Sequence, residues 1–255
     1  MSDEIKVEQI TVPKALFYLV DGLKIALSPK CRAYVVIPII VNILLLILLG
    51  YGTFTYLKAL VFELFDMFPA FLVFFAYVIC ALLGLTIFCV ACYCFSTIAT
   101  IIASPFYGLL ADKVESEING THGDDMGVVD IIKDIPRILL RECKKQMFFL
   151  PLAFICLMIT IIPFLNFLSP FLWFALTSWM GCLQYVDYAY DNHKITFTMM
   201  QKDLRNNMLP TFTIGASIAV CLCVPVLNIL IPPAAVCAGT KYFVELQKRY
   251  QITKG

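Results

Sequence analysis

Two carboxylates, an amide and a histidine gather in one short polar segment, and these side chains are suited to acid–base or metal chemistry. The segment contains Asp187, Asp191, Asn192 and His193. A carboxylate beside a histidine is a common arrangement for proton transfer or metal binding. No H-E-x-x-H, G-x-S-x-G or G-x-x-x-x-G-K-S/T motif accompanies it. Two interpretations stay open: an enzyme site at Asp187–His193, or ion pairs that order the base of a helical segment.

A row of basic residues is the natural partner of these acids. Its four members are four positions apart and therefore lie along one side of a helix: Lys133, Arg137, Arg141 and Lys145. Like charges at this spacing repel unless carboxylates, lipid headgroups or a bound anion relieve them. We predict that the two arginines pair with acids of 187–191 or of 112–117, which includes Glu115, and form a pore or gating network. Anchoring to lipid headgroups is the alternative.

A second basic site is the loop Ser28-Pro29-Lys30-Cys31-Arg32, which directly precedes a long apolar run. Cations beside the free backbone N–H groups of a helix start suit an oxyanion. Lys30 and Arg32 are therefore candidate anion ligands. Lysine and arginine also anchor helices at a membrane interface, so simple anchoring stays open.

One eight-residue motif, P-x-L-N-x-L-x-P, occurs twice inside apolar sequence, at 163–170 and at 225–232. Two prolines that bracket an asparagine break a helix, because proline removes a backbone donor and disfavours helical geometry before it. Broken helices at membrane depth are tolerated only where protein or water satisfies the freed backbone groups. Paired breaks of this kind indicate a transport pathway.

The tips of the two broken segments have a specific electrostatic consequence. Asn166 and Asn228 would lie at the tips, and Pro170 and Pro232 would start the returning half-helices. The positive ends of those half-helices would then face the membrane interior. Partial positive charge without a full cation suits an anion that must bind and also leave. Alternatively, the asparagines only cap the broken helices.

The composition predicts an all-α integral membrane protein. Hydrophobic residues make up 61% of the chain and charged residues 15%, where soluble domains carry about a quarter. Each charge-free run exceeds the roughly 20 residues that cross a bilayer, and no removable signal peptide is expected. The runs are Ala33–Leu57, Met67–Ala111, Gln146–Val186 and Asn206–Thr240.

The lengths of the runs predict a single membrane domain over 1–255. Only 16 residues separate Met147 from the first proline-flanked tip, about 24 Å of helix, which favours hairpins that enter the membrane and return. The expected elements are an interfacial helix (11–28), a transmembrane helix (33–57), a long transmembrane helix with a cytoplasmic extension (70–118), a cytoplasmic helix (128–145) and two re-entrant hairpins (146–186 and 206–246).

Charge predicts the orientation. With this arrangement, 18 of the 19 lysines and arginines lie on one side, which the positive-inside tendency places in the cytoplasm together with both termini. Acids nearly balance them, so the chain is no nucleic-acid binder. Cys89, Cys92 and Cys94 have ligand-like spacing but no neighbouring acid or histidine, so they are interpreted as packing residues. No cofactor or metal is expected.

The chain resembles the CysZ-type bacterial sulfate permease family over about 12–241. The shared pieces, in order, are Ile37-Pro38 with Asn42, Phe95–Ala99, Pro105–Ala111, Lys133–Arg137, Arg141-Glu142, Gln184-Tyr185, Asp187-Tyr188, Asp191–Lys194 and both P-x-L-N repeats.

The resemblance implies sulfate uptake that feeds cysteine synthesis in the bacterial inner membrane, channel-like or ion-coupled, without ATP hydrolysis. It implies two re-entrant hairpins in a homo-oligomer among lipids, for which antiparallel assembly has been proposed, and passage of sulfate with sulfite or related oxyanions. It also implies a sulfate site at the loop before the first spanning helix, normally with two adjacent arginines, where this chain reads Arg32-Ala33. The alternatives are a membrane scaffold or assembly protein and, third, an integral-membrane enzyme at Asp187–His193.

Overall fold

The computed structural model describes residues 10–67, 73–120, 128–224 and 227–254 of the 255-residue chain. Every regular element within these residues is a helix, so the all-α prediction is confirmed for them. The chain divides into two compact units. One unit contains residues 1–36 and 104–255, and the other contains residues 37–103.

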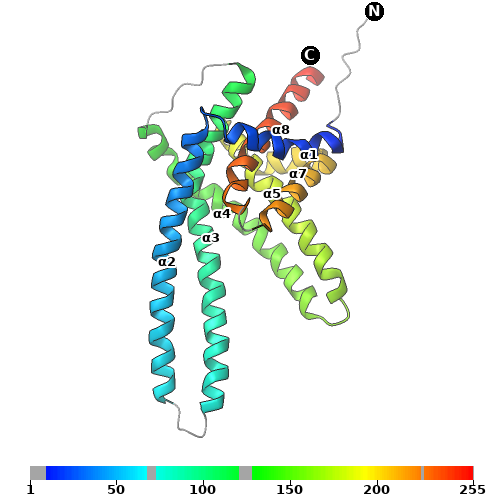
Figure 1. Cartoon of the computed structure of the whole chain (residues 1–255). Helices are drawn as coiled ribbons and strands as arrows, with labels where there is room; N and C mark the ends of the chain where they lie inside the picture. Colours follow the sequence, from blue (N-terminus) through cyan, green and yellow to red (C-terminus); the bar gives the residue numbers. More distant parts are fainter. Residues whose placement is uncertain (1–9, 68–72, 121–127, 225–226, 255) are drawn as a thin grey trace, which may run out of the picture. The chain divides into compact units, whose positions relative to one another are not determined.

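The unit of residues 37–103 is formed by the larger parts of two long helices, α2 (Arg32–Met67) and α3 (Val73–Asn119). Figure 1 shows both as long rods. The side chains along the apolar part of α3 are almost all exposed, and few of those along α2 are buried. Helices that are apolar on every side suit a lipid environment.

Three of the described helices are long and apolar enough to cross a membrane, so the chain is a membrane protein. They are Arg32–Leu60, Tyr77–Asn119 and Pro136–Ile161. The third span belongs to α4 (Val128–Ile161), which is continuous through Pro136 and Pro151. The sequence divided this stretch into a cytoplasmic helix and the first arm of a hairpin. The change from charged to apolar residues at 146 is therefore not the end of a helix.

The repeated P-x-L-N-x-L-x-P motif breaks the helix twice, as its prolines predict. After α4, the 3₁₀ turn η2 (Asn166–Leu168) leads into α5 (Ser169–Asn192), which has Pro170 in its first turn. The same order recurs later in the chain, and its elements are α7 (Met208–Leu222), η3 (Leu227–Ile229) and α8 (Ile231–Lys254). Proline fits the first turn of a helix because the N–H that it lacks has no partner there.

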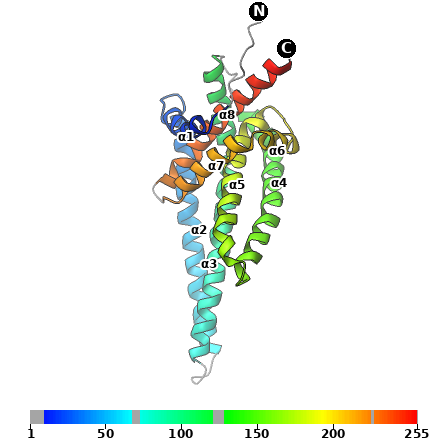
Figure 2. The same cartoon turned by 90° about the vertical axis from the view of Figure 1, so that its right-hand side faces the viewer.

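The unit of residues 1–36 and 104–255 is held together by close helix crossings. Helix α1 (Val12–Ala26) packs against α8, and α7 packs against α5 (Figure 2). The short α6 (Phe197–Asn206) connects α5 to α7 and starts at Thr196, whose hydroxyl accepts a hydrogen bond from the backbone N–H of Met199. The buried core of this unit includes Leu183, Ile214 and Tyr242.

Glycine allows the closest of these crossings. Gly215 on α7 lies directly against the backbone of Ser178 on α5, and Gly181 lies against Gly215. A Cβ atom at position 215 would overlap the Ser178 carbonyl oxygen, so the two helices would have to move apart. The α5–α7 contact therefore depends on the absence of a side chain at Gly215.

We predict that Gly215→Ala lowers the free energy of unfolding by about 1–3 kcal/mol, because overpacking forces the backbone to shift. Gly84→Ala on α3 is the matched control, since no atom lies within 4 Å of the point that its Cβ atom would occupy and a methyl group fits there. Thermal unfolding in detergent micelles measures the difference. Equal stability of the two variants would contradict the close packing of α5 on α7.

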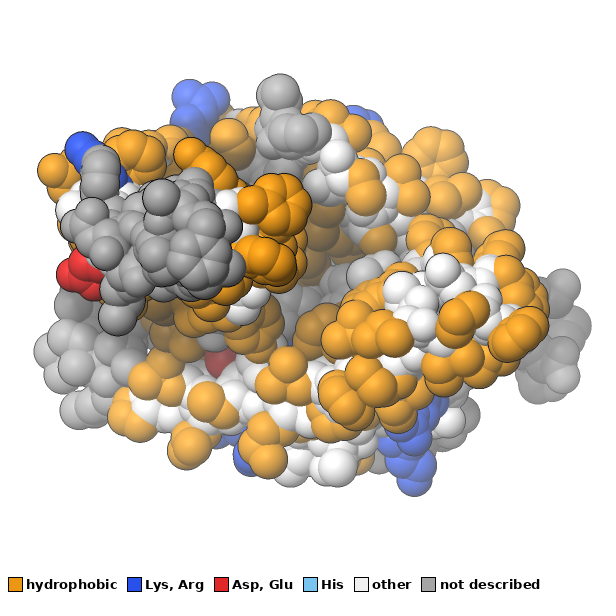
Figure 3. Space-filling model, turned by 90° about the horizontal axis from the view of Figure 1, so that it is seen from below, with side chains coloured by type: hydrophobic (Ala, Val, Ile, Leu, Met, Phe, Trp, Pro, Cys, Tyr) orange, Lys and Arg blue, Asp and Glu red, His pale blue; other side chains and the backbone are white. Residues whose placement is uncertain are grey.

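Seen from the side of the α4–α5 turn, the exposed side chains are mostly hydrophobic (Figure 3). At the turn itself, Phe164 is 90% exposed and Phe167 is 74% exposed. Soluble proteins rarely expose aromatic residues so densely. The tip of this hairpin is therefore built for an apolar environment.

Candidate functional site

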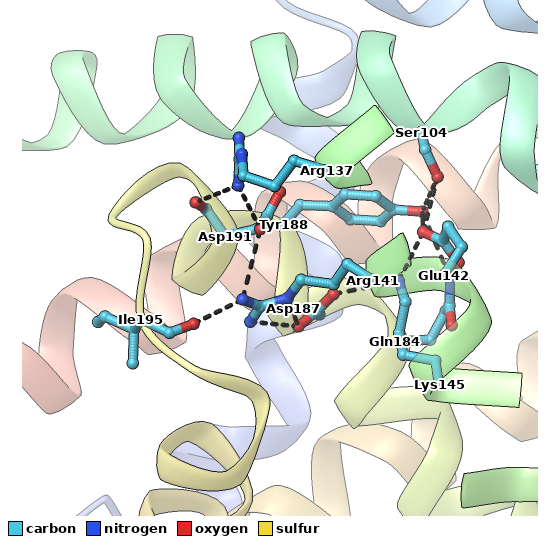
Figure 4. A network of polar contacts seen from close by, with 10 residues as sticks. All are labelled: Ser104, Arg137, Arg141, Glu142, Lys145, Gln184, Asp187, Tyr188, Asp191 and Ile195. Atoms are coloured by element: carbon cyan, nitrogen blue, oxygen red, sulfur yellow. Dashed lines mark hydrogen bonds and ion pairs between the residues drawn. The ribbon is translucent and has the colours of Figure 1, made fainter. Parts of the chain in front are cut away.

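A network of ion pairs connects α4 to α5 (Figure 4). Arg137, Arg141 and Lys145 lie one turn apart on α4 and face the acids Asp187 and Asp191 on α5. The predicted pairing of the two arginines with acids of 187–191 is confirmed. The side chain of Lys133, the fourth member of the row, lies outside the described residues.

Arg141 is the centre of this network. Its Nε and Nη2 atoms lie 2.8 Å and 2.7 Å from Oδ1 of Asp187. Its Nη1 atom donates to the carbonyl oxygen of Ile195 at 2.5 Å and lies 3.3 Å from Oδ1 of Asp191. One guanidinium group therefore ties α4 both to α5 and to the loop that follows α5.

Arg137 forms the outer end of the network. Its Nη1 atom donates to Oδ1 of Asp191 at 2.5 Å and to the carbonyl oxygen of the same residue at 3.0 Å. Its Nη2 atom donates to Oδ2 of Asp134 at 2.8 Å. Burial raises the pKa of the Asp191 carboxyl, and the positive charges of Arg141 and Arg137 oppose that rise.

Lys145 forms the inner end of the network and is only 1% exposed. Its Nζ atom lies 2.6 Å from Oε1 of Glu142 and 3.2 Å from Oδ2 of Asp187. It also lies 4.8 Å from the centre of the Tyr188 ring, in cation–π geometry. Ser104 on α3 donates to the same Glu142 oxygen at 2.7 Å. A buried lysine thus has partners on three sides.

The network alternates between positive and negative groups, and every one of its cations already has a carboxylate partner. The cavity among these residues measures about 20 Å³. That space is close to the minimum for one water molecule and too small for a tetrahedral oxyanion.

The remaining polar residues of this segment bind α3. Asn192 donates through Nδ2 to the carbonyl oxygen of Gly108 at 2.8 Å. His193 Nε2 lies 2.9 Å from both carboxylate oxygens of Glu115. Within the described residues, no group of three histidine, cysteine or acidic residues is placed to hold a metal. The geometry thus gives Asn192, His193 and Glu115 a role in joining α5 to α3.

The basic loop lies between α1 and α2, and its two cations differ in their contacts. Lys30 Nζ lies 3.2 Å from Oε1 of Glu117 near the end of α3. Arg32 is the first residue of α2 and is exposed, and it has no ion-pair partner among the residues that the structure describes. Cys31 between them is fully buried, which fixes the loop against the rest of its unit.

The two hairpin tips lie outside these contacts. Asn166 and Asn228 belong to the exposed 3₁₀ turns, Pro170 is exposed and Pro232 is partly buried. Near the first tip, Thr160 on α4 shares a 2.6 Å hydrogen bond with Ser169 on α5 and accepts another from Trp173 Nε1 at 3.1 Å, which closes this hairpin.

Sequence reasoning missed the inner half of the network. Lys145 belongs to the predicted basic row, and Gln184 and Tyr188 lie in the polar segment beside the acids, but none of the three was predicted to bind Glu142. Ser104 was not predicted as a site residue. A spacing signal did exist, because Gln184 and Tyr188 are one turn apart, as are Asp187 and Asp191, and these pairs mirror the row on α4.

Comparisons with known proteins agree on one family. The family described as "Sulfate transporter CysZ/Etoposide-induced protein 2.4" matches residues 18–233. Proteins named sulfate transporter CysZ from Vibrio atlanticus and Vibrio cholerae are 41% and 40% identical to the chain, covering 92% of it and 94% and 95% of the relatives. The protein of that name from Pectobacterium atrosepticum is 36% identical, covering 92% of this chain and 86% of the relative. The chain belongs to the Sulfate transporter CysZ/Etoposide-induced protein 2.4 family.

Proposed function

We propose that this protein takes up sulfate across the bacterial inner membrane, in a channel-like or ion-coupled manner without ATP hydrolysis, and supplies it to cysteine biosynthesis. Membership of the family supports the proposal, as do the names of the relatives. Three helices long enough to cross a membrane support it as well. The activity is transport and not catalysis, and sulfite or related oxyanions are further candidate substrates.

The row of cations on α4, which runs from the half-buried Arg137 to the buried Lys145, is the observation that carries the proposal. Arg137, Arg141 and Lys145 follow each other along α4 and each contacts a carboxylate. A dianion that replaces these carboxylates one after another would find a cation at every turn of the helix, and it would leave when the carboxylate returns. The network would then act as the gate of the pathway, with Glu115, Asn192 and His193 holding its base to α3.

Sulfate would first bind at the loop before α2, where Lys30 and Arg32 present positive charge. The hairpin tips at Asn166 and Asn228 would lie at membrane depth and complete the path. Residues 146–186 carry no charge, and the first tip exposes apolar side chains, which supports this placement.

The proposed assembly is a homo-oligomer among membrane lipids, with both chain termini in the cytoplasm. The distribution of lysine and arginine supports this orientation. The exposed apolar surfaces of α2 and α3 support contacts with lipids or with further copies of the chain.

Liposomes that contain only this protein test the function. We expect uptake of radiolabelled sulfate above that of protein-free vesicles and without added ATP. If the protein is an ion-coupled carrier, an imposed proton or sodium gradient should raise sulfate uptake. If it is a channel that is not coupled to these ions, the initial rate of uptake should stay unchanged. Protein that inserts into the vesicles but passes no sulfate would support the membrane scaffold instead.

The loop site makes a separate prediction. Arg32→Ala removes a charge-assisted hydrogen bond, which contributes about 1.5–3 kcal/mol, so sulfate affinity should fall roughly tenfold to hundredfold. Calorimetric titration of the purified protein measures this change, and size-exclusion chromatography checks that the oligomer is intact. Unchanged binding would remove the loop from the mechanism.

A further inference from the structure

A third cation lies beside the proposed sulfate site, on a different helix from the first two. Lys30 contacts Glu117 near the end of α3, at 3.2 Å. Lys113 precedes Glu117 by four residues on α3, so the two side chains lie on the same face of that helix, with about 5–6 Å between their Cβ atoms. The ion pair thus brings Lys113 to the same corner of the unit as the loop.

The electrostatics of the buried thiol between Lys30 and Arg32 agree with this placement. Burial raises the pKa of Cys31, and the negative charge of Glu117 raises it further, while the positive charges of Lys113 and Lys30 lower it. Cys31 therefore lies within the field of both lysines and of the one acid. The acid two residues after Lys113 points elsewhere, since Glu115 binds His193.

The three cations differ in whether a carboxylate contacts them. Among the described residues, Lys113 and Arg32 have no ion-pair partner, whereas Lys30 has Glu117. Asp112 next to Lys113 lies within the field of that lysine but forms no ion pair with it, so Glu117 is the one carboxylate in direct contact with any of the three cations among the described residues. Surface cations without a carboxylate partner attract dianions more strongly than monovalent anions, because the Coulomb energy scales with the product of the charges.

We infer that Lys113 is a third sulfate-binding cation and that Glu117 is the internal counter-charge that sulfate must displace from Lys30. The inference rests on the sulfate site proposed at the loop and deepens it. Position 33, next to Arg32, carries alanine and therefore no charge. In the inferred site, Lys113 on α3 supplies the positive charge that position 33 lacks. Glu117 keeps Lys30 paired while the site is empty, which lowers the affinity and allows release.

Calorimetric titration of the purified full-length protein with sodium sulfate at constant ionic strength tests this inference. Lys113→Ala should weaken sulfate binding about tenfold to hundredfold. Glu117→Gln should strengthen it by about tenfold, because Lys30 is then free before sulfate arrives. Lys202→Ala, which removes an exposed lysine of α6, is the matched control and should leave binding unchanged.

A rescue variant separates binding from folding. Ala33 is exposed in the first turn of α2, so Ala33→Arg fits there and should restore most of the affinity that Lys113→Ala loses. If Arg32→Ala weakens binding as predicted while Lys113→Ala behaves like Lys202→Ala, the loop site stands and the role of Lys113 is wrong. If the wild-type protein binds no sulfate, or Arg32→Ala binds it as the wild type does, the proposed loop site fails together with this inference.

Discussion

Asp187→Ala is expected to lower the free energy of unfolding by about 3–5 kcal/mol, because breaking a buried ion pair leaves an uncompensated charge. Asp187 is 1% exposed and is the acid that Arg141 and Lys145 share. After the substitution, Glu142 is the one carboxylate left to Lys145 among the described residues. Arg141 keeps the carbonyl oxygen of Ile195 and, as its carboxylate, only the longer contact to Asp191. Both cations stay largely shielded from solvent, so water cannot fully replace the lost partner.

Asp134→Ala is the matched control for this prediction. Asp134 also pairs with an arginine of the row, but its side chain is 41% exposed, so its loss should cost at most about 1 kcal/mol. Thermal unfolding of both variants in the same detergent measures the two effects. Asp187→Ala combined with Arg141→Met should recover part of the stability, because the cation that loses its carboxylate partner is then removed, while Lys145 keeps Glu142 and Asp191 keeps Arg137. Equal stability of the two single variants would mean that water reaches the network.

The sequence allowed the outer half of this network to be predicted. Arg137 and Arg141 lie four residues apart on a helix, and Asp187 and Asp191 do the same on another, so the two rows could satisfy each other, with the acids of 112–117 as the alternative partners. The helix breaks at the repeated P-x-L-N-x-L-x-P motif were equally predictable, because two prolines in eight residues leave no continuous helix.

The spacing of Gln184 and Tyr188 places them on one helix face, but the burial of the inner half could not be predicted, because it depends on tertiary packing. Lys145 stands at the border between charged and apolar sequence, where a lysine usually extends to water. Its burial follows from the approach of Ser104, 38 residues before its partner Glu142 in the chain. The contact between Lys30 and Glu117 is of the same kind, since the long stretch of sequence between them carries no signal for it.

The continuity of α4 across residues 128–161 was not predicted, for a different reason. Pro136 and Pro151 lie inside it, and the charge of the helix disappears after Lys145, so the sequence suggested two elements. A proline removes one backbone hydrogen bond and kinks a helix, but packing against α5 keeps the helix continuous. The charged part and the apolar part of α4 thus form one continuous helix, which extends from the network to the first hairpin tip.

The hairpin tips give the second prediction with a large effect. If Asn166 and Asn228 lie at membrane depth, cysteines placed at these two positions should react with bulky impermeant thiol reagents far more slowly than a cysteine at a solvent-exposed position. Both residues belong to exposed 3₁₀ turns of the chain, so protein packing alone would not protect them. Only lipid or a neighbouring copy could do so.

The measurement needs a background without the eleven native cysteines. A cysteine at Lys202, on the exposed face of α6, is the matched reference for fast labelling. Reagent is added from outside intact vesicles and then after permeabilisation, so that both sides of the membrane are sampled. Tips in water on either side would label as quickly as position 202 in one of the two conditions.

Proline substitutions extend the test from position to transport. Pro170→Ala and Pro232→Ala each restore a backbone N–H in the first turn of a returning helix and make the repeated P-x-L-N-x-L-x-P motif less helix-breaking. The half-helix N-termini should then lose their fixed place on the path, and sulfate flux should fall more than the amount of folded protein does. Rapid labelling of both tips from the outside, together with normal flux in the proline variants, would rule out re-entrant hairpins and favour helices that cross the membrane completely.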